Sequence, residues 1–169
     1  MKYFIYFIQF LVIIFIFLII KILGLNLGSF FGSFLGKKVG PLFRSKNTIK
    51  KNLKIYLNDI SENEIKNISE KMWSNIGRTF AEYVFLKKFK PNYNNIKILG
   101  LENLNEIKKN NKQAIFISGH FANFELMAMR LQDEGIKLAA IYRPLNNIFL
   151  NPFMEYLRKK YICTNQIKK

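Results

Sequence analysis

Two residue types that often carry chemistry are nearly absent from this chain of 169 residues, which contains one cysteine and one histidine. One cysteine excludes an internal disulfide framework, and one cysteine with one histidine argues against a Cys/His zinc site, so no metal is expected. Any catalysis by histidine has a single candidate, His120. Acidic residues are also scarce. There are 11 Asp+Glu against 27 Lys+Arg, which gives a net charge of +16, while a hydrophobic content of 50% argues against a disordered chain.

The first acidic residue is Asp59, and the first 36 residues of the chain are strongly apolar. The run from Tyr3 to Ile20 has 18 residues without a charge, and Gln9 is its only strongly polar residue. A helix of that length approaches the roughly 30 Å of a bilayer core. A cleaved signal peptide is the competing interpretation, but the residues from Lys21 to Gly24 offer no small-residue cleavage site. The sequence therefore predicts an uncleaved transmembrane anchor.

A ladder of glycines follows the apolar run, with one glycine at every fourth position: Gly24, Gly28, Gly32, Gly36 and Gly40. On a helix this spacing forms a groove of small residues that lets another helix approach closely. The groove predicts a packing seam against the first helix, a neighbouring protein or lipid. The alternative is a flexible re-entrant or interfacial segment, because glycines weaken helices. We expect a helical hairpin or a helix lying on the membrane, so that residues 1–40 form a membrane-associated segment and residues 41–169 a separate domain.

Basic residues cluster just beyond the apolar region, with seven lysines and arginines between positions 37 and 54. Such an excess beside a membrane segment marks the cytoplasmic side, so the remaining domain should face the cytoplasm and an anionic membrane surface. Lys46, Lys50 and Lys54 would form one basic stripe on a helix. Nucleic acid is not expected as a partner, since the sequence contains no helix-turn-helix, zinc or RNP-like signature.

A helix should begin at Ser61, because Ser61 and Glu64 form a capping box. It should continue to about Phe85, with Asn75 and Arg78 pointing to water. Its expected apolar face has helical spacing: Ile65, Ile68, Met72, Ile76 and Phe80.

The second half of the chain alternates between short apolar runs and helical patterns. Strands are expected at residues 96–99, 113–118 and 137–142. Helices are expected at residues 123–133 and 148–161. This alternation predicts an α/β fold with parallel βαβ units, in which sites form beyond the carboxyl ends of the strands. Gly119-His120 and Arg143-Pro144 occupy those places.

His120 and Glu125 are separated by five residues and would diverge on one continuous helix. They can meet only if His120 precedes the helix, with Asn123 as its N-cap and Glu125 in its first turn. A carboxylate facing an imidazole orients it and stabilises the imidazolium formed when it accepts a proton. The pair could act as a general-base dyad. The alternative is a structural histidine that closes a strand–helix turn.

The segment Ser118-Gly119-His120-Phe121-Ala122-Asn123-Phe124-Glu125 resembles the H-x4-D/E block of membrane glycerolipid and lipid A acyltransferases. Its flanks are closer to the lipid A biosynthesis late acyltransferases, the lauroyl/myristoyl acyltransferase family. The block from Tyr142 to Asn147 and the block from Met72 to Glu82 are similar to that family as well, as are the N-terminal anchor and the basic stretch that ends at Leu53.

The resemblance implies acyl transfer at the cytoplasmic face of a bacterial inner membrane, by a glycerolipid-acyltransferase-like α/β domain behind a single-pass or hairpin anchor. The donor would be acyl-acyl carrier protein, and the acceptor a hydroxyl on a 3-hydroxyacyl chain of a lipid A precursor. No cofactor is implied. His120 would be the general base, oriented by Glu125. Arg143, Arg158 and Asn123 would bind substrate, although Arg143 could simply end a strand and Arg158 a solvated helix.

Members of that family are considerably longer, so the resemblance also implies that this chain is an N-terminal portion with an incomplete domain, whose own activity is in question. Two alternatives remain for the function. The chain could be another membrane acyltransferase with a lysophospholipid or glycolipid acceptor, or a non-catalytic membrane-anchored remnant.

Overall fold

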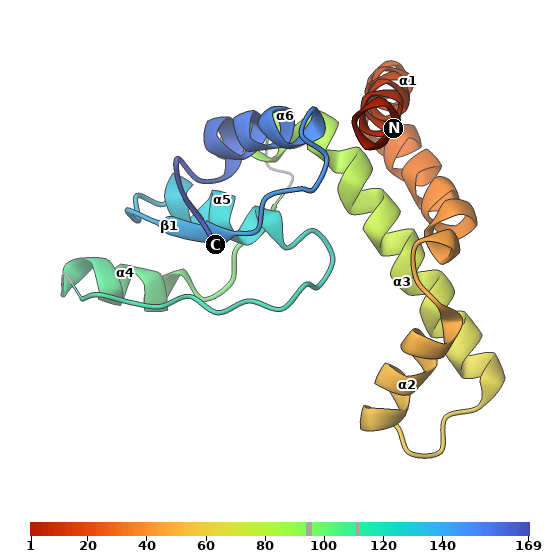
Figure 1. Ribbon diagram of the computed structural model, residues 1–169. Helices are drawn as coiled ribbons and strands as arrows, with labels where there is room; N and C mark the ends of the chain where they lie inside the picture. Colours follow the sequence, from red (N-terminus) through yellow and green to blue (C-terminus); the bar gives the residue numbers. More distant parts are fainter. Residues whose placement is uncertain (94–95, 111) are drawn as a thin grey trace. The chain divides into compact units, whose positions relative to one another are not determined.

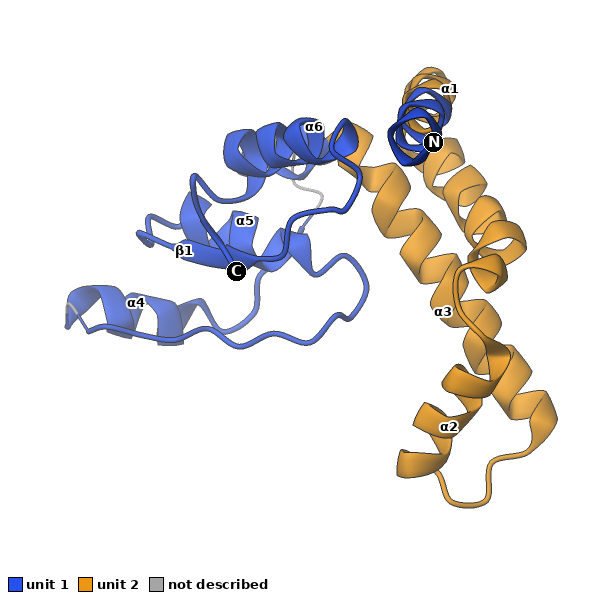
Figure 2. Ribbon diagram, viewed as in Figure 1, with its two compact units in different colours: residues 1–12, 86–169 blue, residues 13–85 orange. Residues whose placement is uncertain are grey.

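The computed structural model describes residues 1–93, 96–110 and 112–169, and in that part the chain is mostly helical with one small sheet. It divides into two compact units, residues 1–12 with 86–169 and residues 13–85 (Figure 2). The sequence predicted a different division, into a membrane-associated segment (residues 1–40) and a domain (residues 41–169). That division concerns function and stays a prediction.

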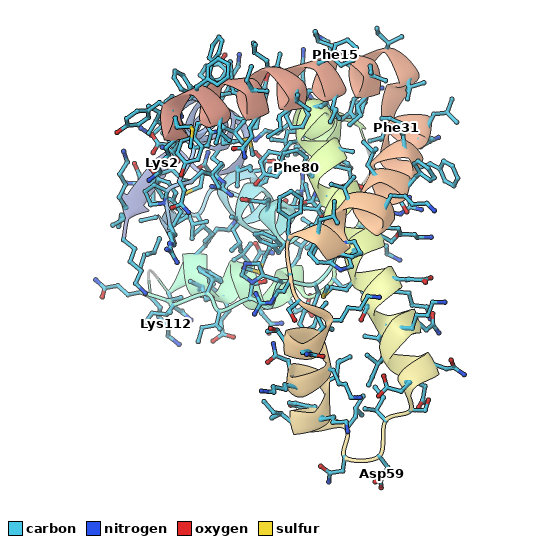
Figure 3. The ribbon with its side chains drawn as sticks, turned by 45° about the vertical axis from the view of Figure 1, so that its right-hand side comes forward. Lys2, Phe15, Phe31, Asp59, Phe80 and Lys112 are labelled. Atoms are coloured by element: carbon cyan, nitrogen blue, oxygen red, sulfur yellow. The ribbon has the colours of Figure 1, made fainter. Side chains whose placement is uncertain are left out.

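Helix α1 (Lys2–Val39) contains the apolar run and the glycine ladder, and it bends at Gly24. Gly24 has φ 78° and ψ 177°, a left-handed conformation that side chains rarely adopt, so glycine is required there. Figure 3 shows the two arms that result, with Phe15 on the first and Phe31 on the second. The helix is long and apolar enough to cross a membrane by length and composition.

The second arm of α1, residues 25–39, packs against α3 (Glu62–Glu82) through its glycines. A Cβ added to Gly32 would lie 2.5 Å from the Gly77 carbonyl oxygen, and one added to Gly36 would lie 2.2 Å from that of Trp73. Ser33 and Ser74 share a hydrogen bond of 2.7 Å across the same seam. The glycines therefore do form a packing seam, but its partner is α3 rather than the first helix, a neighbouring protein or lipid that the sequence predicted.

A 3-10 turn (Gly40–Leu42) leads from α1 to α2 (Lys46–Tyr56), and α3 follows. The expected capping box is confirmed, since the Glu64 amide donates to Ser61 Oγ and the Ser61 amide donates to Glu64 Oε2. The expected apolar face is wrong at Ile76, which is 48% exposed, because the seam with α1 turns Gly77 and Ala81 inward instead. Arg78 is exposed as expected and also donates to Ser29 Oγ at 3.3 Å.

The chain from residue 83 onward passes through two 3-10 segments and then forms the helices and strands of the other unit (Figure 1). The 3-10 segments are η2 (Tyr83–Phe89) and η3 (Pro91–Tyr93), and the later elements are α4 (Leu101–Lys109), α5 (Glu125–Asp133), β1 (Ala139–Tyr142), α6 (Leu150–Leu157), the π-helical turn η4 (Arg158–Ile162) and β2 (Asn165–Lys168). Strands β1 and β2 pair in parallel, with Ala139 opposite Asn165. The expected β1, α5 and α6 are confirmed, and β1, α6 and β2 form one βαβ unit.

Two expected strands are absent from the described part of the chain. Residues 96–99 and 113–118 form no ladder, and the Ile115 and Ile117 side chains are each 91% exposed. A strand needs a hydrogen-bonding neighbour, and β1 pairs only with β2 here. An open groove of about 1040 Å³ lies between residues 113–116, α5 and β1. The larger α/β sheet that the sequence predicted is thus not confirmed.

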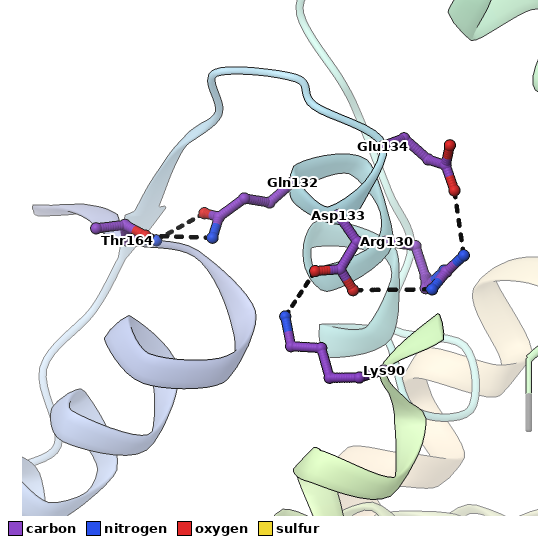
Figure 4. A network of polar contacts seen from close by, with 6 residues as sticks. All are labelled: Lys90, Arg130, Gln132, Asp133, Glu134 and Thr164. Carbon is purple, nitrogen blue, oxygen red and sulfur yellow. Dashed lines mark hydrogen bonds and ion pairs between the residues drawn. The ribbon is translucent and has the colours of Figure 1, made fainter. Parts of the chain in front are cut away.

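The C-terminal end of α5 is held by a polar network (Figure 4). Asp133 accepts from Lys90 Nζ at 2.6 Å and lies 3.8 Å from Arg130 Nη1, while Arg130 Nη2 donates to Glu134 at 3.1 Å. On the other side, the Thr164 amide donates to Gln132 at 2.8 Å. These bonds fix α5 to the segments before α4 and after α6, and thereby fix the position of Glu125 at the other end of the helix.

Candidate functional site

The segment from Gly119 to Phe124 is a tight turn that leads into α5. The Phe121 amide donates to the Gly119 carbonyl at 2.9 Å, and Ala122 has a positive φ of 45°. The Asn123 carbonyl then accepts from the Leu126 amide at 3.1 Å, which starts the helix. His120 thus precedes the helix, as the sequence analysis required.

Glu125 is the first residue of α5, and its carboxylate is buried against Arg158. Glu125 Oε1 accepts from Arg158 Nε at 3.0 Å and from Arg158 Nη2 at 2.7 Å. The amides of the first helical turn favour a carboxylate at this position. The expected place of Glu125 in the first turn is therefore confirmed, and its ion pair with an arginine 33 residues later is an addition to the sequence analysis.

Arg158 starts the turn η4, where α6 ends. Its side chain is only 18% exposed, and its guanidinium carbon lies 6.0 Å from the centre of the Tyr142 ring. Arg158 therefore joins the start of α5 to the end of β1, which corrects the alternative interpretation of a solvated helix end. The neighbouring Lys159 and Lys160 are exposed, as that alternative expected.

His120 is exposed, and its imidazole packs on the Phe124 ring with centroids 4.1 Å apart. Within the described residues this ring contact is the interaction that His120 makes, and the geometry contains no hydrogen bond between His120 and Glu125. The two side chains leave the same turn at opposite ends. Their action as a dyad stays a prediction.

Arg143 and Asn123 complete the predicted set. Arg143 is exposed directly after β1, so its guanidinium is accessible to a substrate. Asn123 is half-buried, but α5 is capped by Phe124 without a side-chain bond, which corrects the expected Asn123 cap. The helix starts one residue later because the Ala122 turn brings the Asn123 carbonyl, rather than its side chain, to the first amides.

The carboxyl end of β1 also carries a cluster that sequence analysis missed. The Tyr142 hydroxyl donates to Glu155, which also binds Lys168 at 3.1 Å and Asn151 at 3.0 Å. The Tyr142 hydrogen bond, helped by Lys168 and Asn151, lowers the pKa of Glu155 to about 2. Burial and Glu155 together raise the pKa of Tyr142. The spacing of Asn151 and Glu155 by four residues was the available signal.

The comparisons with known proteins give one result. A family model described as bacterial lipid A biosynthesis acyltransferase matches residues 1–162. The chain belongs to this family. No curated protein and no solved structure matches it. The resemblance found from the His120 and Tyr142 blocks is therefore confirmed at the level of the family.

Membership in the lipid A biosynthesis acyltransferase family supports acyl transfer as the activity class and implies a lipid A precursor as the substrate. The match includes α1, the whole turn from Gly119 to Glu125, β1 and α6. The apolar helix α1 agrees with the association of this family with membranes.

Proposed function

We propose that this chain transfers an acyl group from acyl carrier protein to the free hydroxyl of a 3-hydroxyacyl chain on a lipid A precursor. The observation that carries the proposal is the family match across the His120 turn, together with Glu125 at the start of α5 directly behind that turn. The acceptor and the donor are both proposals.

In the proposed reaction His120 is the general base. Its imidazole takes the proton of the acceptor hydroxyl as the hydroxyl oxygen attacks the thioester carbonyl carbon. The new carbon–oxygen ester bond forms, the carbon–sulfur bond breaks, and the imidazolium returns its proton to the leaving thiolate. No metal or redox cofactor takes part. The exposure of His120 supports this role, because a long lipid substrate must reach the imidazole.

Glu125 orients His120 in this proposal, and Arg158 positions Glu125. A carboxylate can align an imidazole only if its own rotamer is fixed. The two bonds from Arg158 fix it, since both end on Glu125 Oε1. The side chains of His120 and Glu125 meet when the exposed imidazole turns from Phe124 toward the helix start as substrate binds.

Basic side chains support the choice of substrates. Arg143 is exposed at the end of β1, and an arginine fork suits a phosphate such as those of a lipid A precursor. The net charge of +16 complements acyl carrier protein, which is acidic, and such complementarity speeds encounter. The basic stretch between residues 37 and 54 favours a cytoplasmic position at the bacterial inner membrane.

The proposal is tested by product analysis with the purified full chain in lipid. Acyl carrier protein loaded with a labelled acyl group is offered with a lipid A precursor, a lysophospholipid or a glycolipid, and the labelled lipids are separated. We expect label in the lipid A precursor and a loss of transfer in Arg143→Ala. Label in the lysophospholipid or glycolipid alone would assign a different acceptor. Absence of label from all three would identify a non-catalytic chain.

A further inference from the structure

The long apolar helix α1 has protein contacts near its N-terminal end. Asn147 donates from Nδ2 to the Tyr6 carbonyl at 2.8 Å and approaches Gln9 Oε1 at 3.4 Å. The Phe149 ring packs on Phe7 and Phe10, with centroids 5.4 Å and 6.4 Å away. Gln9, the one strongly polar residue of the apolar run, therefore faces a buried polar partner from the domain.

Asn147 is well suited to hold this contact, because it is itself fixed. Its Oδ1 accepts from the amides of Phe149 and Leu150, at 3.0 Å and 3.1 Å, and so caps the start of α6. Its side-chain nitrogen is then aimed at α1, and the residue is buried. The segment before α6 thus docks on the N-terminal part of α1.

Within the other unit, the C-terminal part of the first arm of α1, just before the bend at Gly24, also packs on protein. Phe17 and Ile20 are buried, and the Phe17 ring lies 5.0 Å from the Phe80 ring of α3. The arm therefore has protein contacts near both of its ends, each within its own compact unit.

A helix that crosses the bilayer could not keep the first set of contacts. With residues 3–20 as the span, Tyr6 and Gln9 would lie within about 8 Å of the bilayer midplane. Asn147 would have to follow them, together with the nearby Arg143 and Glu155. Charged groups are strongly disfavoured at that depth in the hydrocarbon.

The remaining surface of α1 suits an interface. Large apolar side chains are exposed along it: Phe4, Ile8, Leu11, Phe15, Leu18, Leu27, Phe30 and Phe34. Exposed lysines stand at the start, at the bend and at the end: Lys2, Lys21, Lys37 and Lys38. This exposed apolar surface, flanked by cations, suits contact with an anionic bilayer.

We propose that the first arm of α1, residues 2–23, lies in the plane of the membrane with an anionic phospholipid leaflet on its exposed face, rather than across the bilayer. The inference concerns attachment alone and is independent of the acyltransfer chemistry.

The depth of three side chains distinguishes the two arrangements. Phe4, Leu11 and Leu18 are exposed and spaced by seven residues, so they share one face of the helix. Each is replaced by cysteine in a Cys163→Ala full chain, labelled with an environment-sensitive fluorophore and reconstituted in phosphatidylethanolamine–phosphatidylglycerol vesicles. Quenching by lipids brominated at different acyl positions then reports the depth of each label.

The proposal expects the same shallow depth at all three positions. A spanning helix would place the label at position 11 about 10 Å deeper than those at 4 and 18, and this result would overturn the proposal. Absence of quenching at all three would overturn it as well, because the face would then not contact lipid. A label at Glu70, exposed on α3, is the control and should remain unquenched.

Discussion

At the scale of single residues, the candidate site depends on a side chain whose role the sequence only half indicated. Arg158 is placed among lysines at a helix end, a position typical of solvated side chains. The structure places its guanidinium on Glu125 instead. The sequence could predict that Glu125 begins α5, since that depends on local spacing. It could not predict the partner, because the two residues meet only after β1 and α6 have folded.

Loss of Arg158 should destabilise the fold. Arg158→Gln leaves the buried Glu125 carboxylate without its cation, which typically costs about 3–5 kcal/mol for a buried pair. Thermal unfolding of the full chain in detergent, followed by circular dichroism, measures the loss. Adding Glu125→Gln should restore most of it, whereas Lys159→Ala, an exposed neighbour, should change stability by no more than about 0.5 kcal/mol. Equal effects of Arg158→Gln and Lys159→Ala would show that the ion pair contributes nothing.

Glu155 should make stability depend on pH. Its pKa in the folded protein is about 2, below the ordinary value of 4.5, so the unfolded chain binds more protons between these values. The stabilisation is therefore complete above about pH 4.5 and is lost as the pH falls toward 2. The melting temperature of Glu155→Gln should lie below that of the wild type at neutral pH and converge with it in acid. Glu102→Gln, at an exposed position, serves as the control. A gap that is constant between pH 7 and pH 2.5 would contradict this assignment.

At the scale of elements, local signals predicted what local forces decide. The capping box at Ser61 and the helical spacing after Phe124 gave α3 and α5, because each depends on bonds between near neighbours. Strand 113–118 was wrong, since β structure needs a distant partner that its own residues do not encode. Strand β2 was missed for a related reason: its polar residues Asn165–Lys168 become a strand only through pairing with β1.

The glycine seam provides the prediction for this scale. A Cβ at position 77 would lie 2.1 Å from the Gly32 carbonyl oxygen, a backbone atom that cannot move aside. Gly77→Ala should therefore force α1 and α3 apart and cost about 1–3 kcal/mol, as overpacking does. Asn26→Ala, at an exposed position on the second arm of α1, is the matched control. Melting temperatures in detergent compare the two variants, and an unaffected Gly77→Ala would mean that the helices do not pack through their glycines.

At the scale of the whole molecule, three features of the chain agree with a protein that modifies lipids. The apolar helix, the basic residues after it and the exposed histidine all suit the proposed acyl transfer at a charged membrane surface. The single histidine, which with the single cysteine argues against a Cys/His zinc site, is also the single available imidazole base. The family match extends over residues 1–162 and so includes each of these features.

The central claim is that His120 carries the chemistry, and the rate of acyl transfer by His120→Ala tests it most directly. Labelled acyl-acyl carrier protein and a lipid A precursor are supplied to the full chain, to His120→Ala and to Phe121→Ala, which alters an exposed neighbour in the same turn. We predict that His120→Ala lowers the rate by about 10²–10⁴-fold, as loss of a general base does, while Phe121→Ala retains most of the activity. Equal rates for His120→Ala and the wild type would contradict the account.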